Sequence, residues 1–193
     1  MKIAAVQMIS GPDVRPNLDT ASRRIAEAVR AGARLVALPE YFPLIGATDE
    51  ARRAAREAPG TGPIQDFLDE PPRAHGICLV GGSIPLMPAT TRDPDKLLNS
   101  CLVFDDGGRQ VARYDKIHLF NFRKGDEHYD EAATIEAGDR VVAFDTPFGR
   151  IGLAICYDLR FPELFRALGT VDPLVIPAAF TWTTGRAHWE TLL

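Results

Sequence analysis

Short apolar segments typical of buried strands alternate along this chain with longer segments of helical periodicity. Strands are expected at residues 2–8, 34–38, 77–85, 97–105, 110–115, 141–145, 150–155 and 174–176. Helices are expected at residues 16–31, 48–58, 63–75 and 162–168, the second and third being separated by the breaker PGTGP. Alternation of this kind is typical of proteins in which helices cover a sheet, so we predict an α/β fold.

The chain of 193 residues is long enough for one domain with a sizeable core and too short to suggest two. It contains no repeat, low-complexity tract or linker, so residues 1–193 are expected to form a single domain. An amphipathic helix starts at Ala187 and has run for only a few residues at Leu193. A domain seldom ends inside an apolar helix, and we therefore expect this domain to be incomplete at its C-terminus.

The charge balance argues against two classes of partner. Lys and Arg number 22 against 26 Asp and Glu, a net charge of −4, so the basic surface that nucleic acid or an anionic membrane requires is not expected. No segment approaches the roughly 18 apolar residues of a membrane helix. Gln7 interrupts the first apolar run, MKIAAVQMIS, which fits a strand better than a signal peptide. We expect a cytoplasmic protein.

The three cysteines are too widely spaced for a disulfide framework or a CxxC zinc site, and no metal is expected. Cys78 and Cys101 lie inside apolar runs and are predicted to be core thiols. Cys156 lies in IGLAICYDLRFPEL, where a strand meets the start of a helix. Such an elbow exposes the thiol to free backbone N–H groups that favour the thiolate, and it lets the Tyr157 N–H contribute to an oxyanion hole.

Two further polar residues follow predicted strands, and the strand before Glu40 is expected to be buried. Glu40 stands in LVALPEYF, where Pro39 ends the strand and two aromatic residues would partly desolvate the carboxylate, as a general base requires. Lys116 stands in RYDKIHLF, where it could hold a positive charge beside a developing oxyanion. Each residue alone is more often structural or part of a surface ion pair. Three such residues at strand ends predict one site, because α/β sheets gather their sites there.

The motifs LPEYF, YDKIHLF and GLAICYDLRFPELFR occur in this order and resemble the three motifs of the carbon–nitrogen hydrolase, or nitrilase, superfamily. The resemblance extends from KIAAVQM to the last residue. It implies an α-β-β-α sandwich, here without its final strands and helix. It also implies Glu40 as general base, Lys116 as oxyanion stabiliser, Cys156 as nucleophile, and no cofactor.

Members of the family usually carry a second glutamate between the lysine and cysteine motifs. The segment YDEAATIEAGD resembles that region, and Glu131 is the best match in it. Glu127 and Glu136 lie nearby and remain alternatives. The resemblance thus implies a fourth site residue whose position the motif leaves open.

The motifs KIHLF and CYDLRFPE resemble the branch of the family that contains omega-amidase and deaminated glutathione amidase. This implies a small linear amide substrate with a carboxylate at its far end. Arg160, Phe180 and Thr181 are the candidates for the substrate pocket. For Arg160 a structural salt bridge is an equal alternative, since arginine also favours buried ion pairs.

Other functions remain open. A nitrile or N-carbamoyl hydrolase would use the same triad with a different pocket, and an inactive fragment or interaction module is the alternative of another class. A Cys–His dyad with His118 or His128 is less favoured, because His118 alternates to the side of an extended segment opposite Ile117. The family further implies that the full-length protein is a homodimer, formed through residues 161–168 and the helix from Ala187.

Overall fold

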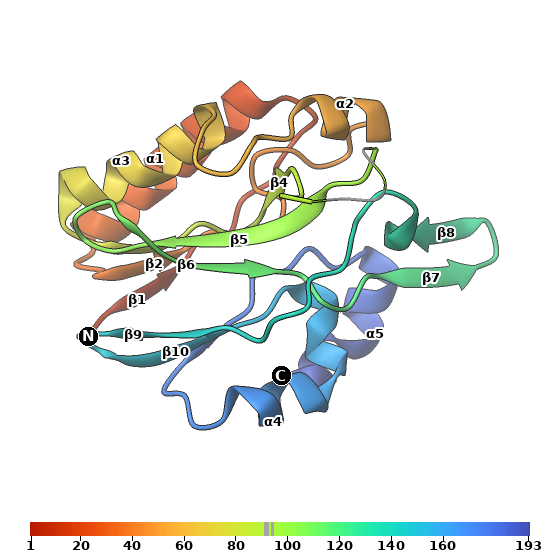
Figure 1. Ribbon diagram of the computed structural model, residues 1–193. Helices are drawn as coiled ribbons and strands as arrows, with labels where there is room; N and C mark the ends of the chain where they lie inside the picture. Colours follow the sequence, from red (N-terminus) through yellow and green to blue (C-terminus); the bar gives the residue numbers. More distant parts are fainter. Residues whose placement is uncertain (91–92, 94) are drawn as a thin grey trace.

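A computed structural model describes residues 1–90, 93 and 95–193 and shows four layers (Figure 1). Helices α1 (Val14–Arg30) and α3 (Pro63–His75) cover one face of a six-stranded sheet. The other face of that sheet packs against a three-stranded sheet. On the outer side of this second sheet lie α4 (Pro162–Leu168) and α5 (Trp182–Leu192). The predicted α-β-β-α sandwich is confirmed.

The six-stranded sheet is parallel on one side and antiparallel on the other. Its strands are β1 (Ile3–Ala5), β2 (Leu35–Ala37), β3 (Cys78–Val80), β4 (Ile84–Leu86), β5 (Leu98–Phe104) and β6 (Gln110–Asp115). Strands β1, β2 and β3 run parallel, and β5 pairs antiparallel with β3, β4 and β6. This arrangement brings the ends of β2 and β6 to the same edge of the sandwich as the start of β5 (Figure 1).

The single strand expected at residues 77–85 is in fact two strands. Strand β3 pairs with the end of β5 and β4 with its beginning, and the chain turns between them at Gly82, whose φ is +58°. A Cβ at Gly82 would collide with the carbonyl oxygen of Pro39, so only glycine fits this close approach. The turn therefore packs directly against the segment that carries Glu40.

The three-stranded sheet has β10 (Gly149–Leu153) at its centre, parallel to β11 (Leu174–Val175) and antiparallel to β9 (Ala143–Thr146). Its inner face and the six-stranded sheet enclose one apolar core, and the helices α1 and α3 enclose another. The expectation that β1 and β11 are buried strands is wrong. Each lies at an edge of its described sheet, and Ile3 and Leu174 are 46% and 44% exposed.

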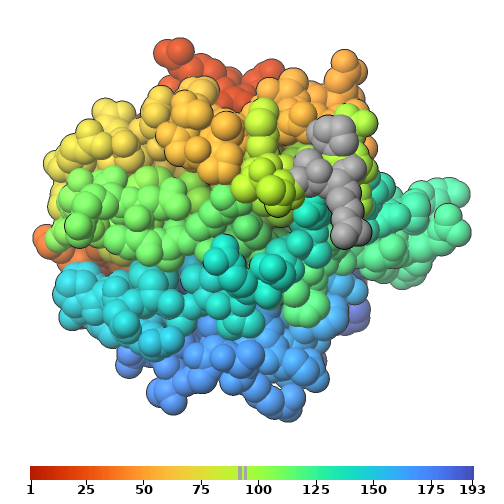
Figure 2. All heavy atoms as spheres, in the orientation of Figure 1, coloured from red at the N-terminus to blue at the C-terminus, as the bar shows by residue number. Residues whose placement is uncertain are grey.

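Several elements differ from the sequence prediction or were not anticipated. Helix α2 (Asp49–Ala54) is shorter than expected, and α5 begins at Trp182 rather than at Ala187, because the Thr181 side chain caps its first turn. The hairpin of β7 (Asn121–Lys124) and β8 (Glu127–Asp130) was missed, as was the short 3₁₀ helix η1 (Glu131–Ala133). The helix expected to start at Cys156 is the short 3₁₀ helix η2 (Cys156–Arg160). The hairpin projects from the body of the molecule (Figure 2), so no apolar alternation marks it. Within the part of the chain that the structure describes, no helix is long and apolar enough to cross a membrane.

The buried carboxylate of Glu57 caps the first turn of α3. It accepts hydrogen bonds from the backbone N–H groups of Ile64 (2.5 Å) and Gln65 (3.0 Å), and from Nε2 of Gln65 (3.0 Å). We expect Glu57→Ala to lower the free energy of unfolding by about 1–3 kcal/mol, because two buried donors lose their acceptor. Urea unfolding followed by circular dichroism measures this. Glu50→Ala, at an exposed position of α2, should change stability by less than about 0.5 kcal/mol, and equal effects would contradict the capping role.

Candidate active site

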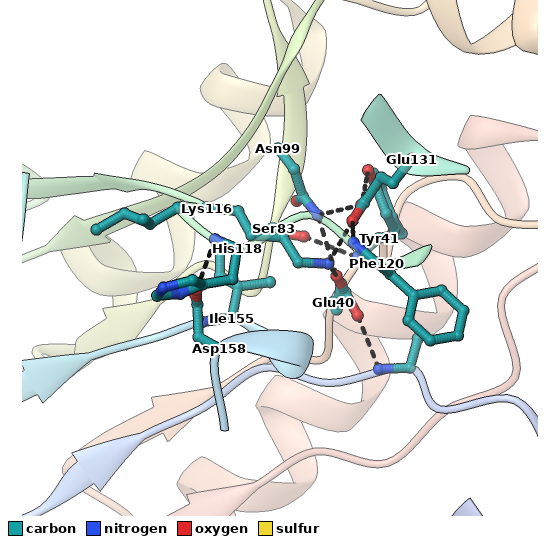
Figure 3. A network of polar contacts seen from close by, with 12 residues as sticks. Glu40, Tyr41, Ser83, Asn99, Lys116, His118, Phe120, Glu131, Ile155 and Asp158 are labelled. Atoms are coloured by element: carbon teal, nitrogen blue, oxygen red, sulfur yellow. Dashed lines mark hydrogen bonds and ion pairs between the residues drawn. The ribbon is translucent and has the colours of Figure 1, made fainter. Parts of the chain in front are cut away.

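Four residues predicted from the sequence meet at one edge of the sandwich: Figure 3 shows Glu40, Lys116 and Glu131 together, and Cys156 lies against Glu40. Glu40 follows β2, Lys116 follows β6, Cys156 follows β10, and Glu131 begins η1 after the β7–β8 hairpin. Glu40, Lys116 and Cys156 are 4%, 2% and 7% exposed, so the charges and the thiol lie largely out of water. The structure therefore brings the four residues into one buried cluster.

The ammonium group of Lys116 lies between two carboxylates. Its Nζ is 2.9 Å from Oε1 of Glu40 and 2.8 Å from Oε2 of Glu131. Burial by itself lowers the pKa of Lys116, but the two carboxylates outweigh it and the pKa lies above its usual value. The lysine is thus a permanent cation at this point of the site.

The second glutamate in contact with Lys116 is Glu131. Besides Lys116, its carboxylate accepts hydrogen bonds from the backbone N–H of Phe120 (2.8 Å) and the hydroxyl of Tyr41 (3.1 Å). The carboxylate of Glu127 instead accepts a hydrogen bond from the Thr183 hydroxyl (2.8 Å). The hairpin stem, and not sequence spacing alone, places Glu131 against the lysine.

Two further groups hold the Glu40 carboxylate, and sequence reasoning missed both. The backbone N–H of Ala179 donates to Oε2 (2.9 Å), and Nδ2 of the fully buried Asn99 donates to Oε1 (3.0 Å). The same Nδ2 lies 3.4 Å from Oε1 of Glu131. The Oδ1 atom of Asn99 has no hydrogen-bond partner among the described residues. Asn99 could have been noticed in the sequence as a polar residue inside β5, a strand that is buried along its whole length.

Cys156 adopts a conformation that is rare for a residue with a side chain. Its φ is 47°, in the left-handed region, at the elbow between β10 and η2. Its own N–H donates to the carbonyl of Pro177 (2.9 Å), and its thiol lies against the Glu40 carboxylate. The elbow directs the thiol at the Glu40–Lys116 pair.

The expectation of a thiolate stabilised by a helix start is wrong. Burial, and after it the charge of Glu40, raises the pKa of the Cys156 thiol well above its usual value. The following helix is a five-residue 3₁₀ turn, too short to offset this desolvation. Cys156 is therefore a neutral thiol at rest, and a base must remove its proton.

The Tyr157 N–H, predicted to face an oxyanion, has no protein acceptor among the described residues. The backbone N–H of His118 donates to Oδ1 of Asp158, and its ring Nδ1 contacts the same oxygen. The His118 ring also stacks on Phe161, with ring centroids 3.7 Å apart. Its contacts therefore support the loop. Among the described residues, no group of three or more His, Cys, Asp or Glu side chains is placed to hold a metal ion.

The predicted pocket residues lie together just beyond the cysteine elbow. The guanidinium of Arg160 lies 5.7 Å from the ring centroids of both Tyr157 and Phe180, and its Nη2 is 3.0 Å from Nδ1 of His188. Within the described part of the chain, Arg160 has no carboxylate partner, so the alternative of a structural salt bridge is not supported there. The Thr181 hydroxyl accepts the N–H of Thr184 as the cap of α5. No observation tests a substrate-binding role for these three residues.

The protonation state of Cys156 can be tested by titration. The ultraviolet absorbance of thiolate, taken as wild type minus Cys156→Ala, should appear only above pH 9.0, because the raised pKa keeps the thiol neutral below it. In Glu40→Gln the midpoint should move to lower pH, since a negative charge that opposes ionisation is removed.

A matched control is Glu127→Gln, which removes a carboxylate near the site that contacts Thr183 rather than the thiol. It should leave the titration unchanged. A thiolate already formed at neutral pH in the wild type would contradict the assignment.

The chain is similar to known proteins over nearly its whole length. The carbon-nitrogen hydrolase family pattern matches residues 2–193. Deaminated glutathione amidase from Yersinia enterocolitica is 40% identical, over 99% of this chain and 67% of the relative, and omega-amidase NIT2-A from Xenopus laevis is 39% identical, over 99% and 68%. The crystal structure of Nit3 from Saccharomyces cerevisiae, a member of branch 10 of the nitrilase superfamily, superposes with a TM-score of 0.79 at 31% identity, over 95% of this chain and 65% of that one. The chain thus spans about two thirds of the length of these relatives, and it belongs to the carbon-nitrogen hydrolase family.

Proposed function

We propose that this chain carries the active site of a cysteine-dependent amidase that converts a small linear carboxylated amide to the acid and ammonia. The observation that carries the proposal is the buried cluster in which the Cys156 thiol contacts Glu40 and Lys116 lies between Glu40 and Glu131. A neutral thiol with an adjacent base and a fixed cation is the arrangement that acyl transfer to sulfur requires. The amidase names of two relatives agree with it.

In the first half-reaction, Glu40 accepts the proton of Cys156 while Sγ forms a bond to the amide carbon. The carbonyl electrons move onto oxygen, and Lys116 and the Tyr157 N–H stabilise this oxyanion. Glu40 then returns the proton to the amide nitrogen, the C–N bond breaks, and ammonia leaves a thioester on Cys156. Both proton transfers use the carboxylate that already contacts the thiol.

In the second half-reaction, Glu40 accepts a proton from water as the water oxygen attacks the thioester carbon. The C–S bond breaks, the carboxylic acid leaves, and Sγ recovers its proton. The role of Glu131 is to hold Lys116 at the oxyanion, because it contacts the ammonium directly and is itself held by Phe120 and Tyr41. No cofactor takes part in either step.

The substrate carboxylate is assigned to Arg160. Its guanidinium has no carboxylate partner among the described residues and lies over two aromatic rings near the elbow. A planar guanidinium binds a carboxylate through two parallel hydrogen bonds, which orients a linear substrate. Phe180 and Thr181, next to the Ala179 N–H that holds Glu40, complete the proposed pocket.

A homodimer of the full-length protein through α4 and α5, and a cytoplasmic location, remain part of the proposal. The exposure of Trp182, at 80%, on α5 is consistent with a surface that another chain covers. Neither point enters the chemistry derived above.

The nucleophile assignment is tested by ammonia release from omega-amides of 2-oxo acids and from deaminated glutathione. Cys156→Ala should abolish turnover, a loss of about 10³-fold or more, and Cys156→Ser should nearly do so, because a hydroxyl is a far weaker nucleophile. Cys78→Ala is a matched control, since it removes another thiol that is also 7% exposed. Turnover that survives Cys156→Ala would refute the mechanism.

The role of Arg160 is tested with two amides of equal length, one carrying the distal carboxylate and one its methyl ester. Arg160→Met should raise KM for the carboxylated amide by about 10- to 100-fold, the value of one charge-assisted hydrogen-bonded pair, and leave KM for the ester nearly unchanged. Arg166→Met on α4, an exposed position, is the control. Equal changes for both amides would exclude carboxylate recognition by Arg160.

A further inference from the structure

The carboxylate of Asp158 is fully buried and accepts four hydrogen bonds, two on each oxygen. Figure 3 shows it beside His118 and Ile155. Oδ1 accepts the backbone N–H of His118 (2.9 Å) and contacts its ring Nδ1 (2.7 Å). Oδ2 accepts the hydroxyl of Tyr114 (2.7 Å) and the backbone N–H of Ile155 (2.8 Å). None of these contacts reaches the reacting atoms, and the mechanism above does not use them.

These four donors belong to the two segments that carry the thiol and the lysine. Ile155 immediately precedes Cys156, and Tyr114 and His118 stand two residues before and two residues after Lys116. The two segments come from different sheets, since Tyr114 lies in β6 and Ile155 follows β10. One carboxylate therefore connects both segments across the boundary between the two sheets.

The elbow needs such a constraint. A non-glycine residue in the left-handed region costs on the order of 1–3 kcal/mol, and it persists only where the surroundings hold it from several sides. Asp158 holds the backbone N–H of Ile155, the residue before Cys156, and the Pro177 carbonyl holds the N–H of Cys156 itself. Without the first of these contacts, the strained φ of 47° would be free to relax.

Four donors point at the side chain of residue 158, so that side chain must be able to accept four hydrogen bonds. Two of the donors are backbone N–H groups, which cannot reverse their direction. Burial, followed by the Asp158 charge, raises the pKa of Tyr114, so its hydroxyl keeps the proton that it donates. Stacking on Phe161 holds the ring of His118 in place. An asparagine at position 158 would direct an NH₂ group at two of these donors.

We propose that Asp158 is a positioning residue that connects the Cys156 elbow to the Lys116 segment and so sets the geometry of nucleophile and cation. It acts through Ile155, His118 and Tyr114 and does not touch the substrate. The expected effect on turnover rests on the proposed amidase function. The expected effect on the exposure of the thiol does not depend on any substrate.

The test compares Asp158→Asn with wild type in two assays, each normalised to folded protein by circular dichroism. In ammonia release, kcat should fall by about 10- to 100-fold, as a misplaced nucleophile predicts, with KM within about threefold. In alkylation by iodoacetamide at about pH 8, followed at Cys156 by mass spectrometry, the rate should rise several-fold, because a relaxed elbow exposes the thiol. A purely structural role would change neither rate per folded molecule, and that result would overturn the proposal.

Two variants keep the test decisive. His118→Phe retains a ring to stack on Phe161 but removes one contact to Asp158, so it should shift both rates in the same directions by less. If Asp158→Asn does not fold, unchanged rates in His118→Phe would overturn the proposal. Asp172→Asn, whose carboxylate accepts the Arg150 N–H at the far end of β10, is the matched control and should leave both rates unchanged. If wild type releases no ammonia, the amidase function fails, and the alkylation assay still decides the role of Asp158.

Discussion

The contact of Lys116 with Glu40 and Glu131 is the constraint on which the rest of the structure depends. A cation that is 2% exposed is tolerated only because two carboxylates lie within 2.9 Å of its nitrogen. Removing Lys116 would leave two carboxylates facing each other without a cation, a large cost in a medium of low polarity. The strand ends that carry these residues must therefore meet closely, and further hydrogen bonds come from Asn99, Tyr41 and the N–H groups of Phe120 and Ala179.

Burial of this cluster has a chemical consequence as well as a structural one. The water exclusion that strengthens the contacts of Lys116 also raises the pKa of Cys156, so the resting nucleophile is a neutral thiol. Glu40 must then act as the base, and its contacts with Lys116, Asn99 and the Ala179 N–H hold its carboxylate in place. The strained elbow at Cys156 and the glycine turn that packs on Pro39 are backbone features that support this arrangement.

Elements with strong local signals were predicted well, and those defined by distant contacts were not. Helices α3 and α4 have the predicted bounds because each begins at a proline and is followed by a glycine with positive φ. The division of residues 77–85 into β3 and β4 depends on the approach of Pro39, which is remote in sequence. The β7–β8 hairpin lies outside both apolar cores, so no alternation of apolar residues marked it.

The sequence by itself determined which chemical groups this protein carries and where its strands present them, because Glu40, Lys116 and Cys156 each follow a predicted strand and stand in a recognisable motif. Only the tertiary structure decided that Glu131, and not Glu127, contacts the lysine, that Asn99 and Asp158 hold the cluster, and that the thiol is neutral. Those properties depend on side chains brought together from 15 to 76 positions apart and on the water that they exclude. Local sequence specifies neither which side chains meet nor where water is excluded, since both arise from packing the two sheets against each other.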